Sequence, residues 1–333
     1  MKIVKTLIFL TLFIVGNSYF NQVFSQEINS TDENEEIIFY PYWEKDDHFV
    51  YEVTRVKSKS SKNNPPKIDS SVYTVDLTVL DTLNEEYLLK WNIDYQYLSN
   101  EIPSEIRAEI KELLDLEIIY KADILGNFIG IENWEVLSGQ MKNYMIKLTK
   151  LIAEKSGQSD DILQSMEKFF STITSKESLE YFIFKEIPTF HSLYDISLPI
   201  SEPLVYENEG PTPFSKNLQK FNTKISLLNI DEENGLCILK EETEMEQESM
   251  KTIMNDFVKE NFNSFSDEKE FDEALKLIKL NISKSKTQSI NYNDGVIHNL
   301  IYETSTSIDL PENNQVENET IKIRLLPTSQ DKH

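Results

Sequence analysis

The sequence predicts an α+β protein built on a long, curved antiparallel β-sheet, with helices packed over one face. Three observations predict this class. Long runs in the first third alternate apolar and polar residues, an apolar period of 3.6 residues begins near residue 133, and paired strand-like runs around tight turns fill the last third. With 333 residues, of which 39% are apolar, the chain can bury a sizeable core.

The first 25 residues are typical of a secretory signal peptide. Lys2 and Lys5 precede an apolar run from Thr6 to Val15, and Ser25 favours cleavage after that residue. The alternative is a membrane anchor, but the apolar run has about ten residues, whereas roughly 20 are needed to span a bilayer. Because the single cysteine, Cys237, is far from the cleavage site, we expect no lipid anchor. We therefore expect a soluble protein that is periplasmic or extracellular.

The charge balance excludes nucleic acid as a natural partner. The chain has 33 basic and 57 acidic residues and a net charge of −24. Cleavage would remove two lysines and bring the net charge to −26. Such a surface repels a phosphate backbone.

The chain has one cysteine, Cys237, which cannot form an internal disulfide, and this fits a bacterial envelope protein. The apolar run around Cys237 predicts a buried side chain rather than a reactive thiol.

Changes in composition divide the chain into segments. We assign residues 1–25 to a signal peptide, 26–36 to a disordered acidic leader, 37–187 to a first strand and helix half, 188–220 to a proline-rich connector, 221–326 to a second strand and helix half, and 327–333 to a disordered tail. Both halves follow the order strand, acidic turn, strand, helix, strand, glycine turn, strand. This order indicates either a duplication or a chance coincidence of elements.

In the first half, alternation predicts two long paired strands, over Val72–Leu80 and Tyr87–Leu98. Residues 58–71, which include two consecutive prolines, are expected to be an exposed connection. A helix is expected from Pro103, and a hairpin over residues 118–132, with Gly126 in its turn.

Three helices are expected next. The first begins at Trp134 and ends at Gly157, the second begins at Asp160, and a shorter one covers Lys176–Glu186. In the second half we expect strands over Phe221–Ile230, Leu236–Met245, Thr287–Tyr292 and Val296–Ile308, and helices around Met250 and Phe271.

Two short segments resemble secreted bacterial families of unknown function. These are Trp43–Tyr51, which leads into a Tyr-x-Val strand, and Tyr120–Trp134, which contains Gly126 and enters a helix at Asn133-Trp134. The chain has Asp46 where those families have glycine. The families are similar to the lipoprotein-carrier half-barrel, so the resemblance implies a half-barrel sheet with an apolar concave side.

No catalytic or cofactor motif is present, and we expect no cofactor. Two Ser-x-x-Lys matches, Ser165–Lys168 and Ser283–Lys286, are interpreted as accidental because Lys-Thr-Gly is absent. The four histidines lie far apart, which argues against a transition-metal site. Calcium would suit the acidic turns Asp231–Gly235 and Asn291–Gly295, but their spacing is that of hairpin turns.

What remains is an apolar surface. The candidate ligand-binding residues come from the strand over residues 87–98 and from the helix that begins at Trp134: Tyr87, Trp91, Tyr95, Met141 and Met145. If strand and helix pack tightly, these residues form a core, and if they are held apart they line a pocket for a lipophilic ligand.

The sequence therefore favours a non-enzymatic binding or carrier module that takes a lipophilic small molecule. The alternative is a scaffold or interaction protein with a solid core, whose partner is another envelope protein. A hydrolase of undetected type is the third hypothesis.

Overall fold

The computed structural model describes residues 36–62, 64–83, 85–94, 116–156, 174–212, 215–246, 248–253, 279–310 and 313–327. These residues are mostly β-strands, and the antiparallel sheet predicted from the sequence is confirmed. The predicted α+β class is supported only in part, because helices are few within the described ranges.

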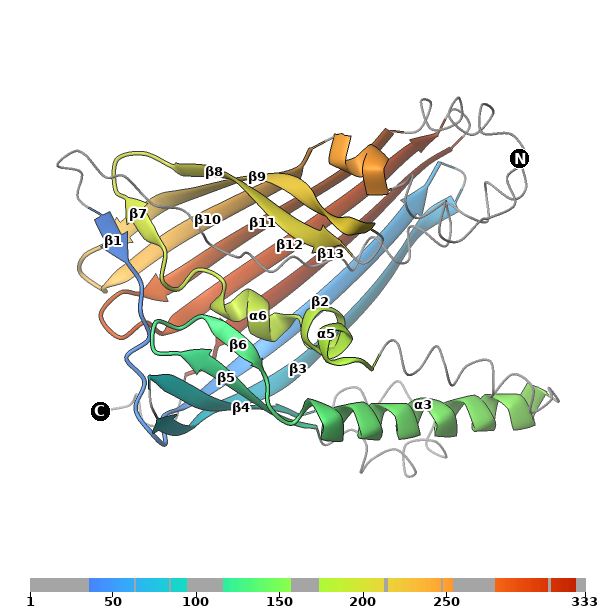
Figure 1. Ribbon diagram of the computed structural model, residues 1–333, viewed down its shortest axis with the longest axis horizontal. Helices are drawn as coiled ribbons and strands as arrows, with labels where there is room; N and C mark the ends of the chain where they lie inside the picture. Colours follow the sequence, from blue (N-terminus) through green and yellow to red (C-terminus); the bar gives the residue numbers. More distant parts are fainter. Residues whose placement is uncertain are drawn as a thin grey trace. The chain divides into compact units, whose positions relative to one another are not determined.

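Eleven of the described strands form one sheet, in the order β6-β5-β4-β3-β2-β13-β12-β11-β10-β9-β8 (Figure 1). Within this sheet β2 to β6 pair in chain order, β8 to β13 pair in chain order, and β2 pairs with β13. The chain therefore meanders from β2 to one edge of the sheet and returns from the other edge to β13. A separate two-stranded sheet pairs β1 (Glu36–Ile38) with β7 (Ser197–Pro199).

The chain forms two compact units. Unit 1 comprises residues 1–38, 54–70 and 196–322, and unit 2 comprises residues 39–53, 71–195 and 323–333. Strands β2 (His48–Ser61), β3 (Asn64–Leu83) and β13 (Asn313–Leu325) contribute residues to both units.

Unit 2 contains the hairpin predicted from the strongest alternation. Strand β3 pairs with β4 (Glu86–Asp94), and Leu77 lies opposite Trp91. Alternate residues of β4 are buried, as expected for a strand with one face toward the core. Strand β4 pairs in turn with β5 (Glu117–Asp123), and β5 pairs with β6 (Phe128–Ile131).

The expected connection over residues 58–71 is exposed at residues 65–70, as predicted, but most of it is strand rather than loop. Strand β2 continues to Ser61, and β3 begins at Asn64, so both prolines lie inside a strand. The pairing of β4 with β3 covers only Thr74–Leu83. Proline lacks a backbone N–H and is tolerated where a strand does not need to donate to a neighbour. The residues after the prolines in β3 are exposed and mostly polar, so they lack the apolar alternation that predicts a strand.

The predicted glycine hairpin over residues 118–132 is confirmed as β5–β6. Gly126 has a φ of 98°, a conformation that side-chain-bearing residues rarely adopt. A Cβ atom at this position would lie 2.6 Å from Cγ of Tyr194 and 2.8 Å from Cδ of Pro41. The Asp123 carboxylate accepts hydrogen bonds from the backbone N–H groups of Leu125 and Asn127, and these bonds close the turn.

Replacing Gly126 by alanine is therefore expected to lower the free energy of unfolding by about 2 to 4 kcal/mol, because backbone strain adds to overpacking. Gly139→Ala in helix α3 is the matched control: a Cβ atom added there would have nothing within 4 Å, and we expect a gain of up to about 1 kcal/mol. Urea unfolding followed by tryptophan fluorescence measures both changes. Equal effects of the two substitutions would contradict the prediction.

Helix α3 (Trp134–Ser156) begins at the residue predicted from the sequence. The backbone N–H of Leu137 donates to the carbonyl of Asn133, which makes Asn133 the N-cap. The Asn133 side chain also holds this end of the helix to β5, accepting from the Ile119 N–H and donating to the Glu117 carbonyl.

The short helix expected over Lys176–Glu186 is replaced by three successive pieces. These are α5 (Lys176–Ser178), the π-helical turn η2 (Leu179–Ile183) and α6 (Glu186–His191). The expected extended connector, residues 188–220, contains the end of α6 together with β7, β8 (Leu204–Thr212) and the start of β9 (Ser215–Asp231). Pro188, Pro199 and Pro211 therefore lie in α6, β7 and β8 rather than in a single loop.

In unit 1 the predicted strands of the second half are present: one has the predicted bounds, Leu236–Met245, and the strands that contain Phe221 and Thr287 are longer than expected. They are β9, β10 (Leu236–Met245), β11 (Lys279–Asn291) and β12 (Ile297–Leu310). The acidic and glycine turns between them are hairpin turns, as predicted, with Gly235 and Gly295 at positive φ. Cys237 is buried in β10, as predicted, and burial raises the pKa of its thiol to about 11.

Strand β13 was not predicted from the sequence, because polar residues occupy its inward positions in unit 1. Gln315 and Glu319 are buried there. The Glu319 carboxylate lies 3.6 Å from Nζ of Lys57, and Glu317 lies 3.5 Å from Nζ of Lys59, both on β2. Cross-strand charge pairing thus replaces the apolar alternation by which a strand is usually identified.

Several predictions fall outside the described residues. These are the signal peptide, the acidic leader up to residue 35, the helices expected at Pro103, Asp160 and Phe271, and the tail from residue 328.

Candidate functional site

In unit 2, two of the predicted ligand-binding residues are packed inside the core. Trp91 is 1% exposed, and its ring meets that of Phe190 from α6 edge to face, with the centroids 5.7 Å apart. The buried Tyr87 donates its hydroxyl to the Pro41 carbonyl at 3.0 Å and packs against Trp43. At these two positions the structure is that of a core.

The other predicted residues are less informative. Met141 and Met145 are half-buried on α3, and Tyr95 lies outside the described residues. Figure 1 shows α3 running away from the ends of β4, β5 and β6. The ring that packs against Trp91 is that of Phe190, which belongs to α6 and not to α3. The sequence predicted only the first residue of α6. A ligand site made by these five residues stays a prediction.

The core of unit 2 also encloses a neutral histidine. Nδ1 of His191 donates to the Gly126 carbonyl at 2.7 Å, because a carbonyl oxygen can only accept. Nε2 then accepts from the Tyr120 hydroxyl at 3.0 Å. Burial lowers the pKa of His191 to about 4 and raises the pKa of Tyr120 well above its usual value. Both side chains are therefore uncharged near neutral pH and tie α6 to the β5–β6 turn.

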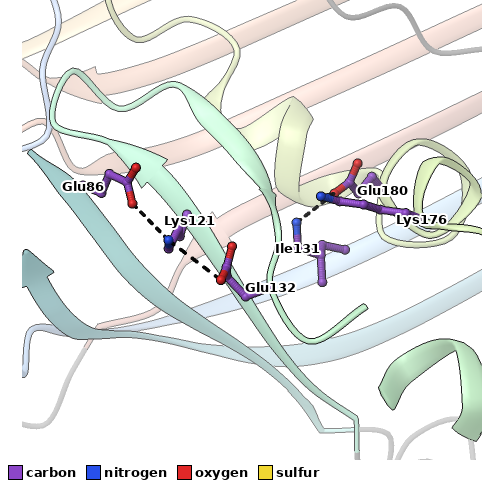
Figure 2. A network of polar contacts seen from close by, with 6 residues as sticks. All are labelled: Glu86, Lys121, Ile131, Glu132, Lys176 and Glu180. Carbon is purple, nitrogen blue, oxygen red and sulfur yellow. Dashed lines mark hydrogen bonds and ion pairs between the residues drawn. The ribbon is translucent and has the colours of Figure 1, made fainter. Parts of the chain in front are cut away.

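Two buried carboxylates fix the helical segment in unit 2. The Tyr73 hydroxyl donates to Oε1 of Glu186 at 2.6 Å. Oε1 of Glu180 accepts from the backbone N–H of Ile131 at 2.8 Å and lies 3.8 Å from Nζ of Lys176 (Figure 2). Burial is the main factor that raises the pKa of Glu180. The hydrogen bond from the Ile131 N–H and the charge of Lys176 act in the opposite direction and lower this pKa. These contacts hold η2 and α6 to the strands, and we interpret them as structural.

A second network in Figure 2 lies on the exposed side of the β5–β6 hairpin. Nζ of Lys121 is 3.1 Å from the Glu86 carboxylate and 3.8 Å from that of Glu132. The hydrogen bond to Glu86, followed by the charge of Glu132, raises the pKa of Lys121. Exposed pairs of this kind contribute little to stability, so this network is a solvated surface.

The polar interior of unit 1 is different, because its strands bring charged and amide side chains onto a buried face. In β11, alternate residues Lys286, Gln288 and Ile290 are buried. Residues directly opposite in an antiparallel pair share a face. Gln288 lies opposite Leu239 of β10 and Leu300 of β12, and both leucines are fully buried.

One step along the same face, a buried ion pair crosses from β11 to β10. Nζ of Lys286 lies 2.6 Å from Oε2 of Glu241, directly opposite in the register. Burial lowers the pKa of Lys286, and the nearby Glu241 carboxylate opposes this shift. The charges of Lys286 and Glu241 thus compensate each other locally. At the next position of β10 on this face, the Thr243 hydroxyl forms a hydrogen bond with the Thr223 hydroxyl at 3.1 Å.

Gln288 is the exception in this face. Its side chain is 0% exposed, yet neither Nε2 nor Oε1 has a hydrogen-bond partner among the residues that the structure describes. Leaving a buried amide unsatisfied costs about 1 to 3 kcal/mol in proteins. Buried polar side chains almost always have a partner, so this amide is where a bound group with a donor and an acceptor would be stabilised.

Sequence analysis missed Lys286 and Gln288 as candidates. Residues 283–289 of β11 are all polar, so no apolar alternation distinguishes the inward from the outward positions. The sequence singles out Lys286 only through the Ser283–Lys286 match. These two residues are three apart in a strand and therefore lie on opposite faces, so they cannot act together.

Within the described ranges, three or more His, Cys, Asp or Glu side chains nowhere gather as a metal site would require. The helices of these ranges include none with both the length and the apolar character of a membrane span. The chain matches no protein-family model, and no curated protein is significantly similar to it.

Proposed function

We propose that the protein is an exported, non-enzymatic binding module that carries an amphipathic small molecule against the β10–β11–β12 face of unit 1. The observation that carries this proposal is the fully buried Gln288 amide, which lacks a hydrogen-bond partner among the described residues. It lies between Leu239 and Leu300, so a polar group and an apolar chain would both find complementary contacts there.

Energetics support a bound molecule at this position. A leucine in place of Gln288 would continue the apolar row without an unsatisfied amide, so glutamine costs stability in the unliganded fold. A ligand that satisfies the amide would offset this cost and stabilise the folded state, by an amount that rises with the logarithm of its concentration relative to Kd.

The second candidate function is a scaffold with a solid core, and its support comes from unit 2. Trp91 packs against Phe190, and the Tyr87 hydroxyl already donates to the Pro41 carbonyl, so neither residue has an unmet polar contact that a ligand would satisfy, as the Gln288 amide has. For this reason we favour the unit 1 face over the row of Tyr87, Trp91 and Tyr95 with Met141 and Met145 as the place of binding.

The remaining parts of the proposal concern location and shape. We propose cleavage after Ser25 and a soluble, unlipidated product in the periplasm or outside the cell, on the basis of the leader sequence. We also propose a curved, half-barrel-like sheet built by duplication. In support, β3–β6 and β9–β12 are each four consecutive strands paired in chain order.

Native mass spectrometry of the chain recovered from a soluble envelope fraction tests the function. We expect an intact mass that begins at Gln26 and an adduct of one small molecule, which Gln288→Leu removes. Thr287→Val is the matched control, because Thr287 lies on the other face of β11. It should retain the adduct.

Two results would contradict this proposal. A wild-type protein without any adduct would favour the scaffold, with an ordered water at Gln288. An adduct that survives Gln288→Leu would place the ligand elsewhere. Recovery only in the membrane fraction with Met1 retained would overturn the export proposal by itself.

A further inference from the structure

We infer that the head group of the ligand is uncharged and presents a hydrogen-bond donor beside an acceptor, as a carboxamide does, on an aliphatic chain. This inference rests on the proposed function, because it names the chemical class that the β10–β11–β12 face would select. Three features of the face lead to this inference: the donor and acceptor groups of the Gln288 amide, the local charge balance and the apolar neighbours.

The amide inventory sets the hydrogen-bonding requirement. A glutamine side chain has an NH₂ group that donates and a carbonyl oxygen that accepts. In Gln288 both ends lack a partner among the described residues. A group that only accepts would leave Oε1 unsatisfied, and a group that only donates would leave Nε2 unsatisfied. A primary amide on the ligand satisfies both atoms at once.

The charge balance disfavours an ionic head group. Nζ of Lys286 is already 2.6 Å from the Glu241 carboxylate, so its charge is compensated. A carboxylate head beside Gln288 would gain Lys286 as a neighbour but would be repelled by Glu241. An ammonium head group would be attracted by Glu241 but repelled by Lys286. Either ion would also lose its hydration on a buried face, a cost that a neutral amide avoids.

The neighbours of Gln288 set the rest of the ligand. Leu239 and Leu300 flank it across the sheet, and Ile290 follows it on the same face of β11. All three are fully buried. Aliphatic side chains on three sides of one amide match a molecule with a single polar group at the end of an apolar chain.

Titration calorimetry with three probes that share one tail tests the inference: octanamide, octanoate and octylammonium at pH 7. We expect wild-type protein to bind octanamide at least tenfold more tightly than either ion. Gln288→Leu should lose at least tenfold in octanamide affinity and leave the weak binding of the ions unchanged. It should also fold, since leucine continues the row of Leu239 and Leu300. Thr287→Val should bind all three probes as wild type does.

The outcomes separate the head group from the function. Tighter binding of octanoate or octylammonium than of octanamide would overturn the inferred head group while the carrier function stands. The same holds if no probe binds although the native adduct is present. Octanamide binding that Gln288→Leu leaves intact would overturn the assignment to this face. If no probe binds and no adduct is found, both proposals fail.

Discussion

Trp91→Ala is expected to lower the free energy of unfolding by about 3 to 5 kcal/mol, the range for removing a large buried aromatic side chain. Trp91 is 1% exposed and lies at the centre of β4, opposite Leu77 of β3 and Ile118 of β5. Phe190 covers it from α6. The substitution would leave a cavity between the sheet and α6 that these neighbours can only partly fill.

The measurement is urea or thermal unfolding of wild type and variant, repeated with dodecanoate as a fatty-acid-like probe. Tyr42→Ala is a suitable control, because Tyr42 belongs to the same unit and is 62% exposed. It should change stability by no more than about 0.5 kcal/mol.

The two interpretations of the aromatic row give different results. A large loss of stability, with the same dodecanoate binding by wild type and Trp91→Ala, agrees with a solid core in unit 2. A small loss together with weakened dodecanoate binding would instead restore the row of Tyr87 and Trp91 as a ligand surface, since a pocket wall already lacks packing partners on one side. No change in either property would contradict the burial of Trp91.

Acidification is expected to destabilise the protein through His191 by about 3 kcal/mol between pH 6.5 and pH 4. Burial lowers the pKa of His191 in the folded state to about 4, whereas an unfolded chain has the ordinary value of 6.5. Between these values the unfolded state binds a proton that the folded state does not. The contribution of neutral His191 is therefore complete above pH 6.5 and is lost as the pH falls toward 4.

The surroundings of His191 explain the size of this effect. The rings of Trp43, Tyr120 and Tyr194 lie against the imidazole, and the Gly126 carbonyl is held by Nδ1. Protonation would place a second N–H against the Tyr120 hydroxyl, which now donates to Nε2. The carboxylate of Asp123 favours the charged form but does not outweigh burial.

Urea unfolding of wild type and His191→Gln at several pH values measures the effect. The slope of stability against pH, rather than its level, is the readout, because other acidic groups titrate in both proteins. We expect a shallower slope for His191→Gln over this window. Parallel curves for wild type and His191→Gln would show that His191 does not have a lowered pKa.

Parts of the fold could be predicted because the chain repeats a local pattern. Strict alternation in the β3–β4 hairpin, Gly126 in the β5–β6 turn and the start of α3 at Trp134 all follow from short-range rules. Strand β13 and the first residues of β3 could not be predicted in this way. Their inward or paired positions hold polar residues and prolines, whose cost depends on distant partners such as Lys57.

The candidate site shows the same division. The residues around Trp91 are apolar, so the sequence predicted that they gather, but only the packing of Phe190 decided that they form a core. Nothing local marks Gln288, since it lies in an all-polar strand. Its position between Leu239 and Leu300 comes from strand register.

By itself, the sequence determined the antiparallel sheet and the turns that carry glycine or paired acids, because these depend on neighbours a few residues away. The strong negative charge follows from composition alone. The tertiary structure alone decided which face is buried in the strands without apolar alternation, such as β11, and what covers each buried face. Burial of Lys286, Gln288 and His191 depends on segments that are distant in the chain, and such contacts leave no local periodicity. Desolvation then lowers the pKa values of His191 and Lys286. It also removes water from the Gln288 amide, on which the proposed function rests.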